Sequence, residues 1–246
     1  MERSMTRRRA LAALGGVSLG SALAACGNDD GKRATGSAST TTTGPPTTTS
    51  SPGALTGASS LADRFAQSAT CSITPEETEG PFYFDVNSVR RDVREDRTGN
   101  TLRLGLRVVD PSCDPIPDAV VEIWHCDAAG VYSGFDSGAG ETFLRGAQVT
   151  DTNGIAEFLT VYPGWYRGRT VHIHAKVHLD NRTALTTQLF FDDDFTATIF
   201  SQSPYPGNGD RDVFNNDDGI FDQRTLLTLS TEGQATLGLM TFGVSA

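Results

Sequence analysis

The stretch from Val171 to Leu179 alternates strictly between apolar and polar side chains. Its polar members are His172, His174, Lys176 and His178. Successive side chains of a β-strand point to opposite faces, so this pattern predicts a strand with one face against a core. Residues two apart share a face, and the imidazoles of His172 and His174 can therefore converge on one metal ion.

The chain after Cys71 consists of short alternating segments separated by clusters of turn residues. The expected strands are 102–108, 119–124, 155–161, 171–179, 187–191, 226–229 and 235–240, the last two joined as a hairpin across 231–233. We expect no strong amphipathic helix and no internal repeat. Such a series favours an all-β fold, either an antiparallel β-sandwich or a barrel.

Composition narrows the class of protein. With 246 residues, of which 37% are hydrophobic, the chain can form the core of one ordinary domain with tails. The net charge is −10, and no cluster of lysine and arginine follows the first ten residues. The chain therefore lacks the positive surface that binds phosphate backbones, and nucleic acid is not an expected partner.

Residues 1–25 have the pattern of an export signal. The segment 6–11 is similar to a twin-arginine signal, and the apolar run 10–25 is shorter than the roughly 20 residues of a membrane span. Leu23-Ala24-Ala25-Cys26 is similar to a lipoprotein cleavage box. We expect an exported protein, held by lipidated Cys26 on the outer face of the cytoplasmic membrane or secreted. A plain secretory signal cut elsewhere is the alternative.

Residues 26–68 are expected to form a flexible linker. Between Arg33 and Asp63 the chain has no charged residue and consists mainly of Thr, Ser, Gly, Pro and Ala. Such a segment cannot bury enough apolar area to offset the entropy of ordering it. The folded domain is therefore expected to span residues 69–246.

Several motifs of this domain occur in a fixed order. They are Glu79-Gly80-Pro81-Phe82-Tyr83, Val121-Glu122-Ile123-Trp124-His125, Ala129-Gly130-Val131-Tyr132-Ser133, Pro163-Gly164-Trp165-Tyr166, Arg169 with His172-Ile173-His174, and Thr187-Gln188-Leu189. In this order they resemble the intradiol ring-cleavage dioxygenases. The resemblance extends from about Cys71 to Phe221, which is nearly the whole expected domain.

The resemblance implies a non-haem Fe(3+) centre inside a prealbumin-like or Ig-like antiparallel β-sandwich with long loops. The implied metal ligands are Tyr132, Tyr166, His172 and His174. It also implies an oxidoreductase that cleaves a catechol-type ring between its two hydroxyls, adding both atoms of O2 to give a cis,cis-muconate-type product. Arg169 then stabilises negative charge on the substrate, Gln188 assists by hydrogen bonding, and Tyr166 also accepts a substrate proton. No NAD(P)H or flavin is implied.

The chemistry of these ligands agrees with iron. Phenolate oxygen is a hard anionic donor suited to a trivalent ion, and imidazole is a common iron ligand. Free tyrosine titrates near ~10, so it becomes a ligand at neutral pH only beside a strongly positive ion. A pair of tyrosinates therefore favours Fe(III) over Zn(II).

The second tyrosine ligand has two candidates in the sequence. Only two residues separate Tyr166 from Arg169, whereas soluble family members carry a longer insertion there. Tyr166 is preferred because Pro163-Gly164-Trp165-Tyr166 has the family's spacing of Pro, two residues and Tyr, which leaves Tyr162 as a neighbour of the pocket. The short loop also predicts a more open site.

Other notable residues are interpreted as structural. The resemblance gives no ligand role to His125 and His178, and Trp124 is expected in the core. Gly80-Pro81 is expected to make a turn that sets the next two aromatic residues against the site.

The acidic run 192–194 and the loop 208–218 lack the spacing of an EF-hand, so solvated turns are favoured over a calcium site. An exported chain permits disulfides. We expect Cys71 to pair with Cys113 and Cys126 to remain a buried thiol, although the sequence does not fix this pairing.

The rival hypothesis is a lipid-anchored β-sandwich that binds sugar or protein without catalysis, and a copper or zinc site is a third option. The four-ligand set with Arg169 favours the enzyme, whose partners are a small catechol-type substrate and O2. The sequence determines neither the particular catechol nor the oligomeric state.

Overall fold

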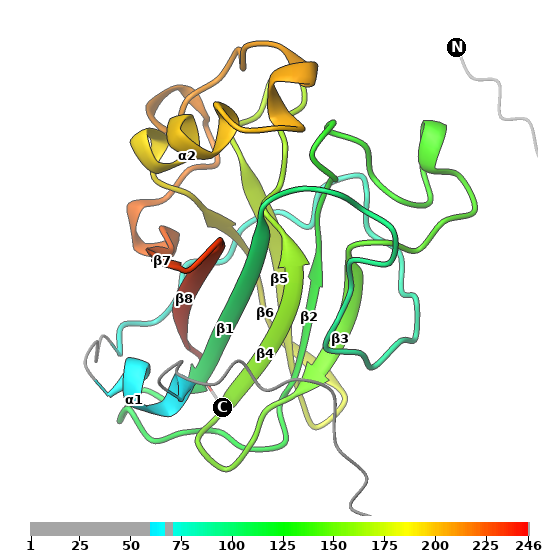
Figure 1. Ribbon diagram of the computed structural model, residues 1–246. Coiled ribbons are helices and arrows are strands. Elements are labelled where there is room, and N and C mark those ends of the chain that lie inside the picture. Colours follow the sequence, from blue (N-terminus) through cyan, green and yellow to red (C-terminus); the bar gives the residue numbers. More distant parts are fainter. Residues whose placement is uncertain (1–59, 67–70, 246) are drawn as a thin grey trace, which may run out of the picture. The chain divides into compact units, whose positions relative to one another are not determined.

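The computed structural model describes residues 60–66 and 71–245 (Figure 1). The predicted signal segment 1–25, Cys26 and the linker up to residue 59 lie outside the described residues, so the predictions made there stay predictions. Among the residues described, no helix is long and apolar enough to cross a membrane.

The first sheet, sheet A, has the strand order β4-β1-β8-β7. Its strands are β1 (Thr101–Val109), β4 (Ile155–Val161), β7 (Thr228–Glu232) and β8 (Ala235–Gly243). β1 pairs antiparallel with β4, and β7 with β8, whereas β1 and β8 run parallel. The expected hairpin between the last two strands is present.

The second sheet, sheet B, has the order β3-β2-β5-β6 and is antiparallel throughout. Its strands are β2 (Val120–Trp124), β3 (Arg145–Val149), β5 (His172–Leu179) and β6 (Arg182–Phe190). β5 lies between β2 and β6, so the strand that carries the histidines is a central one. A central strand has its backbone hydrogen-bonded on both edges, which fixes the side chains that it presents.

The two sheets contribute to one hydrophobic core. The inward residues of β1 are Leu102, Leu104, Leu106 and Val108, and those of β5 are Ile173, Ala175, Val177 and Leu179. All are buried in the same cluster, as the period-2 pattern predicts. The other face of β5 is buried as well, since His172, His174 and Lys176 are 2%, 1% and 7% exposed. This second buried face is covered by loops rather than by a sheet.

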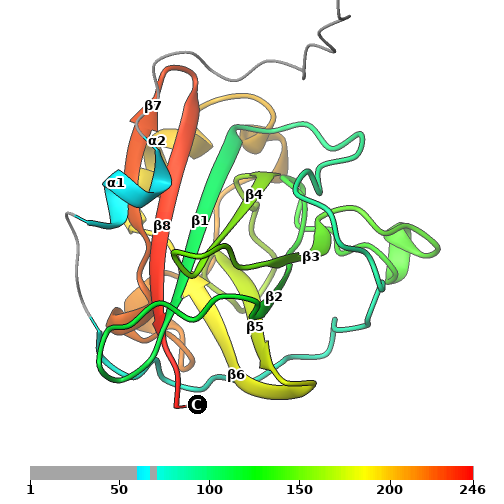
Figure 2. The ribbon, with the colours of Figure 1, turned by 90° about the horizontal axis from the view of Figure 1, so that it is seen from below.

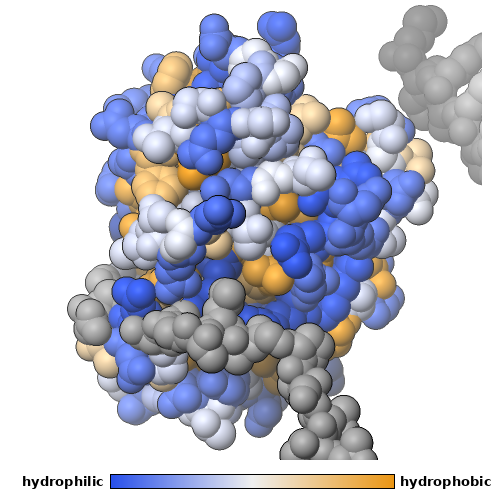
Figure 3. Space-filling view, viewed as in Figure 1, coloured by the Kyte–Doolittle hydropathy of each residue, from blue (hydrophilic) through white to orange (hydrophobic). Residues whose placement is uncertain are grey.

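Short helices complete the fold. They are α1 (Leu61–Phe65), α2 (Asp193–Phe200) and the 3-10 turns Asp136–Gly138, Tyr205–Asn208, Asn215–Asp217 and Gln223–Thr225. α1 packs Leu61 and Phe65 against Leu237 and Leu239 of β8, and it lies beside that strand in Figure 2. On the face shown in Figure 3, apolar residues form separate small areas among hydrophilic ones.

The structure corrects the sequence predictions at the domain's edges. The assignment of 26–68 to a flexible linker is wrong for residues 61–65, because α1 packs on sheet A there. The run 192–194 is not a solvated turn: Asp192 caps α2 by accepting a hydrogen bond from Phe195 N, and acidic side chains suit a helix N-terminus. This eight-residue helix is too short to give a clear periodic signal.

Two features of the sheets were also not predicted. β3 lacks alternation of apolar and polar residues, yet it forms because it pairs with β2. Its Gly146 packs closely on Val93, since a Cβ there would lie 2.8 Å from Val93 Cγ1. The expected antiparallel pairing does not hold between β1 and β8, which run parallel, since neighbouring turns carry no information about pairing between distant strands.

The cysteine prediction is confirmed. Cys71 and Cys113 form a disulfide across 42 residues of sequence, and Cys126 is a buried free thiol. The disulfide ties the start of the described domain to the loop that follows β1.

Candidate metal centre

The two histidines of β5 meet two tyrosines from separate loops. Tyr132 lies in the loop after β2, and Tyr166 lies in the loop between β4 and β5. Tyr132 is only 4% exposed, while Tyr166 is half-buried. The tight pairing of β5 with β2 and β6 holds both imidazoles on one face, and the loops bring the phenols to that face.

Four donor atoms lie within hydrogen-bonding distance of one another. His172 Nε2 is 3.1 Å from His174 Nε2, 3.2 Å from the Tyr166 hydroxyl and 3.4 Å from the Tyr132 hydroxyl. His174 Nε2 is 3.1 Å from the Tyr132 hydroxyl. Metal–ligand bonds of about 2.0–2.2 Å place neighbouring ligand atoms roughly 3–3.5 Å apart, so the spacing fits one ion.

The imidazoles have the protonation state that metal binding requires. His172 Nδ1 donates to the carbonyl oxygen of Thr170 at 2.7 Å, so its Nε2 carries a free lone pair toward the cluster. Burial, aided by the positive charge of Arg169, lowers the pKa of His172 to about 3. Burial and the neighbouring His172 likewise lower the pKa of His174 well below its usual value. Both rings are therefore neutral donors at neutral pH.

The phenols need a cation to become ligands. Burial raises the pKa of Tyr132 well above its usual value and that of Tyr166 to about 12, with Arg169 acting in the opposite direction on both. Within the described residues no group of three or more His, Cys, Asp or Glu side chains is placed to hold a metal. A centre built on the two histidines must therefore use the tyrosine oxygens, which suits a hard, highly charged ion.

Aromatic rings enclose the centre. Trp124 stacks on His174 with 4.9 Å between ring centroids and 4° between planes, and Phe82 stacks on Tyr132 at 4.4 Å. Gly80 lies against the His174 ring with φ +72°, and a Cβ there would be 3.1 Å from His174 Cε1. The expected turn at Gly80-Pro81 is present, and glycine is needed there to let the loop approach the imidazole.

A cavity of about 330 Å³ opens beside the two phenols. Tyr132 and Tyr166 line it together with the apolar residues Phe82, Val131 and Phe135. Asp136, Ser137 and Arg167 add polar groups. The walls suit a planar aromatic ring, which could reach the phenol side of the cluster.

Arg169 and Gln188 form one hydrogen-bonded unit next to the histidines. Arg169 Nη2 donates to Gln188 Oε1 at 2.6 Å, and its Nε donates to Asp218 Oδ2 at 2.8 Å. Gln188 is the cross-strand neighbour of His174, and its amide donates to the carbonyl oxygen of Thr78 at 2.8 Å. The guanidinium is thus a fixed positive charge at the edge of the cluster.

Other candidates lie away from the cluster. Tyr162 is fully buried, and its hydroxyl is 2.8 Å from Thr196 Oγ1. His125 has both ring nitrogens bonded within the protein, to Cys126 O at 2.8 Å and to Thr160 Oγ1 at 2.7 Å. His178 lies on the same face of β5 as His172 and His174 but further along the strand, and its Nε2 is bonded to Glu122.

Two residues beside the centre were missed by sequence reasoning. Asp218, which anchors Arg169, was considered only as part of an acidic loop. Arg145 is fully buried, and its guanidinium lies over the ring of Tyr132. It was not noticed because it lies in β3, a strand without alternation of apolar and polar residues. In the sequence, an arginine outside any motif gives no indication of a functional role, and only its burial in the structure does so.

The fold and the cluster define an all-β protein with a two-histidine, two-tyrosine centre. A family model described as Dioxygenase matches residues 78–203. An intradiol ring-cleavage dioxygenase from Tetranychus urticae is 34% identical, with a TM-score of 0.68, over 71% of this chain and 95% of that chain. The chain belongs to the intradiol ring-cleavage dioxygenase family.

Other relatives show the range of the family. The dioxygenase domain of a dioxygenase–carbohydrate-binding fusion from a Streptomyces species is 28% identical, with a TM-score of 0.57, over 71% of this chain and 99% of that one. Catechol 1,2-dioxygenase of Acinetobacter baylyi is 34% identical over an alignment of 141 residues that covers 47% of this chain and 45% of the relative. The chain thus spans about half the length of the curated relatives it matches.

Proposed function

We propose that this chain is an Fe(III)-dependent intradiol dioxygenase that cleaves catechol-type rings between their two hydroxyls, using O2, to give cis,cis-muconate-type products. One observation carries the proposal: two phenol oxygens and the Nε2 atoms of two neutral imidazoles meet at 3.1–3.4 Å. The family and the catechol dioxygenases among its members support the reaction type. The scaffold proposed for it is a β-sandwich of sheets A and B.

The proposed ligands are Tyr132, Tyr166, His172 and His174. When bound, ferric iron would draw electron density from a chelated catechol and so make the ring reactive toward O2. The two imidazoles hold their side of the centre rigidly, because β5 is a central strand and His172 Nδ1 is fixed by Thr170 O.

Tyr166 is the phenol suited to take up a substrate proton. Both phenols line the cavity, but Tyr166 is half-buried, whereas Tyr132 is buried under the stacked ring of Phe82. Burial raises the pKa of Tyr166 to about 12, so its phenolate would be a strong base whenever it is not bound to an ion. The same residue can therefore serve as ligand and as proton acceptor.

Arg169 and Gln188 have complementary roles. The guanidinium stays charged, and its position is fixed by Asp218 and Gln188, so it can stabilise negative charge on a bound substrate without rearrangement. Gln188 orients Arg169 through its side-chain oxygen. Phe82 and Trp124 stack on the rings of Tyr132 and His174 and so hold these two side chains in place.

Oxygen uptake by the purified full chain, loaded with iron, tests the proposal. We expect uptake with at least one member of a catechol panel and a product heavier than the substrate by two oxygen atoms. We also expect about one iron per chain and a visible tyrosinate-to-iron charge-transfer band. A colourless protein that takes up no iron would favour a binding module, and a tightly held copper or zinc would favour a different centre.

We further propose that the protein is exported and anchored through lipidated Cys26. The support is the sequence pattern of residues 6–11 and 23–26. Cell fractionation of wild type and Cys26→Ser tests it: wild type is expected in the membrane fraction and the variant outside it. Equal distribution of the two forms would contradict the lipid anchor.

A further inference from the structure

Arg145 opens β3 at its end nearest the metal centre. It is the cross-strand neighbour of Trp124, the residue that stacks on His174. Arg145 itself is only 1% exposed. Nε donates to Ser133 Oγ and Nη2 donates to the carbonyl oxygen of Ser133, both at 2.8 Å. Ser133 directly follows Tyr132, so the guanidinium grips the backbone that carries one proposed ligand.

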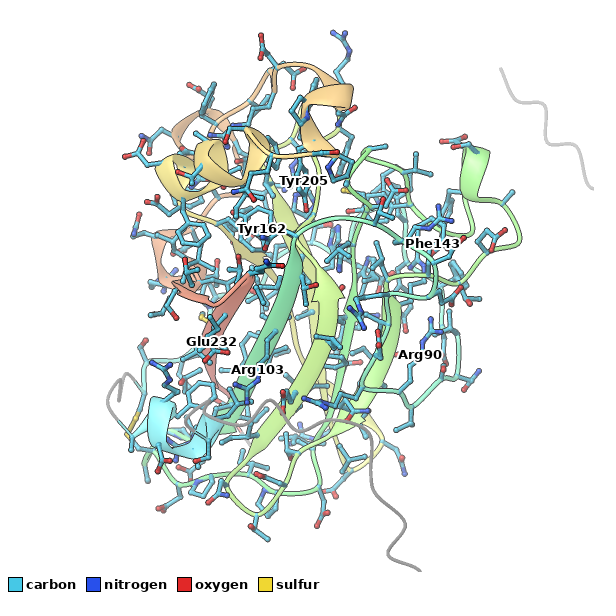
Figure 4. All side chains as sticks on the ribbon, in the orientation of Figure 1. Arg90, Arg103, Phe143, Tyr162, Tyr205 and Glu232 are labelled. Carbon is cyan, nitrogen blue, oxygen red and sulfur yellow. A yellow bond between two sulfur atoms is a disulfide. The ribbon has the colours of Figure 1, made fainter. Side chains whose placement is uncertain are left out.

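The segment held by Arg145 has support from both sides. Ser133 Oγ in turn donates to the carbonyl oxygen of Phe143 at 2.6 Å. The carbonyl oxygen of Arg145 accepts a hydrogen bond from Arg90 Nε at 2.9 Å. Arg90 and Phe143 are labelled in Figure 4, on the β3 side of the molecule. This network fixes the guanidinium and the Tyr132 loop relative to each other.

The charge of Arg145 has no carboxylate partner among the described residues. Its Nη1 is buried without any hydrogen-bond acceptor, and no salt bridge of the described chain includes it. Its immediate surroundings are aromatic: Cζ lies 4.2 Å from the ring centroid of Phe84, 5.7 Å from that of Phe135 and 6.0 Å from that of Tyr132. Aromatic faces attract a cation, but they do not neutralise it.

An uncompensated buried cation is costly, so its retention calls for a counter-charge. Of the rings around it, Tyr132 is the one proposed to become an anion when an ion binds. The charge of Arg145 would then be compensated only in the metal-loaded protein.

We propose that Arg145 is a positioning residue of the metal centre, which holds the backbone of Tyr132 and supplies the counter-charge on the phenol side. The inference rests on the proposed function, because only a bound ion makes Tyr132 anionic. It explains why an arginine, rather than a neutral residue of similar length, lies in this aromatic enclosure.

Iron titration and absorption spectra of the full chain test the proposal in wild type, Arg145→Met and Arg145→Lys. Methionine keeps much of the volume without the charge, and lysine keeps the charge without the two-pronged grip. We expect about 10–100-fold weaker iron binding in Arg145→Met, the range for residues that support metal ligands. Its band is expected to move to longer wavelength, because a nearby cation stabilises the electron-donating phenolate. Arg145→Lys is expected to lie between the other two.

Thermal melts with and without iron separate positioning from plain stability. Arg103→Met is the matched control, since Arg103 is also a strand arginine but is paired with Glu157 and Glu232. We expect iron to raise the melting temperature less in Arg145→Met than in wild type, and equally in Arg103→Met and wild type.

Two results would overturn the inference. One is wild-type iron affinity and absorption in Arg145→Met. The other is an equal loss of melting temperature with and without iron, which would show a purely structural residue. If wild-type protein binds no metal, the proposed function fails together with this inference, whereas normal iron binding by Arg145→Met removes the inference alone.

Discussion

Two pairs of tyrosines in this molecule have opposite surroundings. Tyr162 and Tyr205 lie near α2, where Figure 4 labels them close together, and each hydroxyl is bonded to ordinary protein groups. The Tyr162 hydroxyl meets Thr196 Oγ1, and that of Tyr205 donates to the carbonyl oxygen of Tyr162 and accepts from Asn100 N. The hydroxyls of Tyr132 and Tyr166 meet the Nε2 atoms of neutral imidazoles.

The difference lies in what each pair leaves unsatisfied. Around Tyr162 and Tyr205 every hydroxyl has a neutral partner, so the pair fixes the packing of α2 and its loop and needs nothing else. Around Tyr132 the buried groups left without partners include His174 Nδ1, Trp124 Nε1 and Arg145 Nη1. Buried tyrosine alone therefore does not indicate a metal centre, and the proposed centre is supported by the imidazole nitrogens and the unpartnered polar groups beside Tyr132.

The largest expected effect comes from removing a site hydroxyl. Tyr132→Phe and Tyr166→Phe each remove one proposed ligand oxygen and leave the ring in place. We expect iron affinity and ring cleavage to fall by more than the roughly 100-fold seen when a residue behind a ligand is lost. Iron content and the charge-transfer band measure this directly. Wild-type colour in Tyr132→Phe would break the comparison, because the site tyrosines would then be ordinary core residues.

A smaller effect, on stability alone, is expected from Tyr205→Phe. The change leaves Asn100 N and the carbonyl oxygen of Tyr162 without their partner in a buried place. Leaving such groups unsatisfied costs about 1–3 kcal/mol, so chemical denaturation should show a loss in this range. Iron binding per folded chain should stay at the wild-type level. A lost band in the folded variant would mean that the two tyrosine regions are coupled.

Tyr162→Phe is expected to cost less than Tyr205→Phe. Thr196 Oγ1 already donates to the carbonyl oxygen of Asp192 at 2.7 Å, so the Tyr162 hydroxyl is the donor in their shared bond. Its removal leaves one hydroxyl oxygen without a donor, and a typical hydrogen bond contributes about 1 kcal/mol. Denaturation should show this small loss while the absorption of the iron centre remains. This variant is also the control for Tyr166→Phe, since the two tyrosines were rival ligands in the sequence.

The choice between Tyr162 and Tyr166 shows how far sequence reasoning reached. Spacing from a proline favoured Tyr166, and the structure does bring Tyr166, not Tyr162, to His172. The strands with clear alternation, such as β1, β4 and β5, were predicted within one residue at each end, because period-2 burial is written into a single strand.

The rest depended on contacts between distant segments. β3 has no alternation of its own and forms through its partner β2, and the parallel pairing of β8 with β1 joins opposite ends of the domain. For the same reason Asp218 and Arg145 could not be assigned to the site. Their roles follow from which groups they meet or fail to meet after folding.

The smallest effect is expected where charges are fully paired. On sheet A, Arg103 bonds to Glu157 and Glu232, and Figure 4 shows Arg103 and Glu232 side by side. Burial alone would raise the pKa of Glu157, but hydrogen bonds from Arg103 and Arg91 outweigh it and hold that pKa below its usual value of 4.5. A depressed pKa stabilises the folded state above the unfolded pKa, and this contribution is lost as pH falls through the folded value.

Glu157→Gln should therefore lower stability by about 1 kcal/mol or less at neutral pH, the range for partly exposed ion pairs. The difference from wild type should shrink as pH falls below 4.5 and vanish below the depressed folded pKa, where Glu157 has lost its charge in both the folded and the unfolded chain. Denaturation curves between neutral and acid pH would measure both, and iron binding at neutral pH should not change. Arg103, which is paired with carboxylates, would then affect stability alone, whereas the unpaired Arg145 would affect iron binding. The two arginines would differ as the two tyrosine pairs do. If Glu157→Gln instead disturbed the iron centre as Arg145→Met is expected to, charge pairing would not separate structural from functional arginines in this fold.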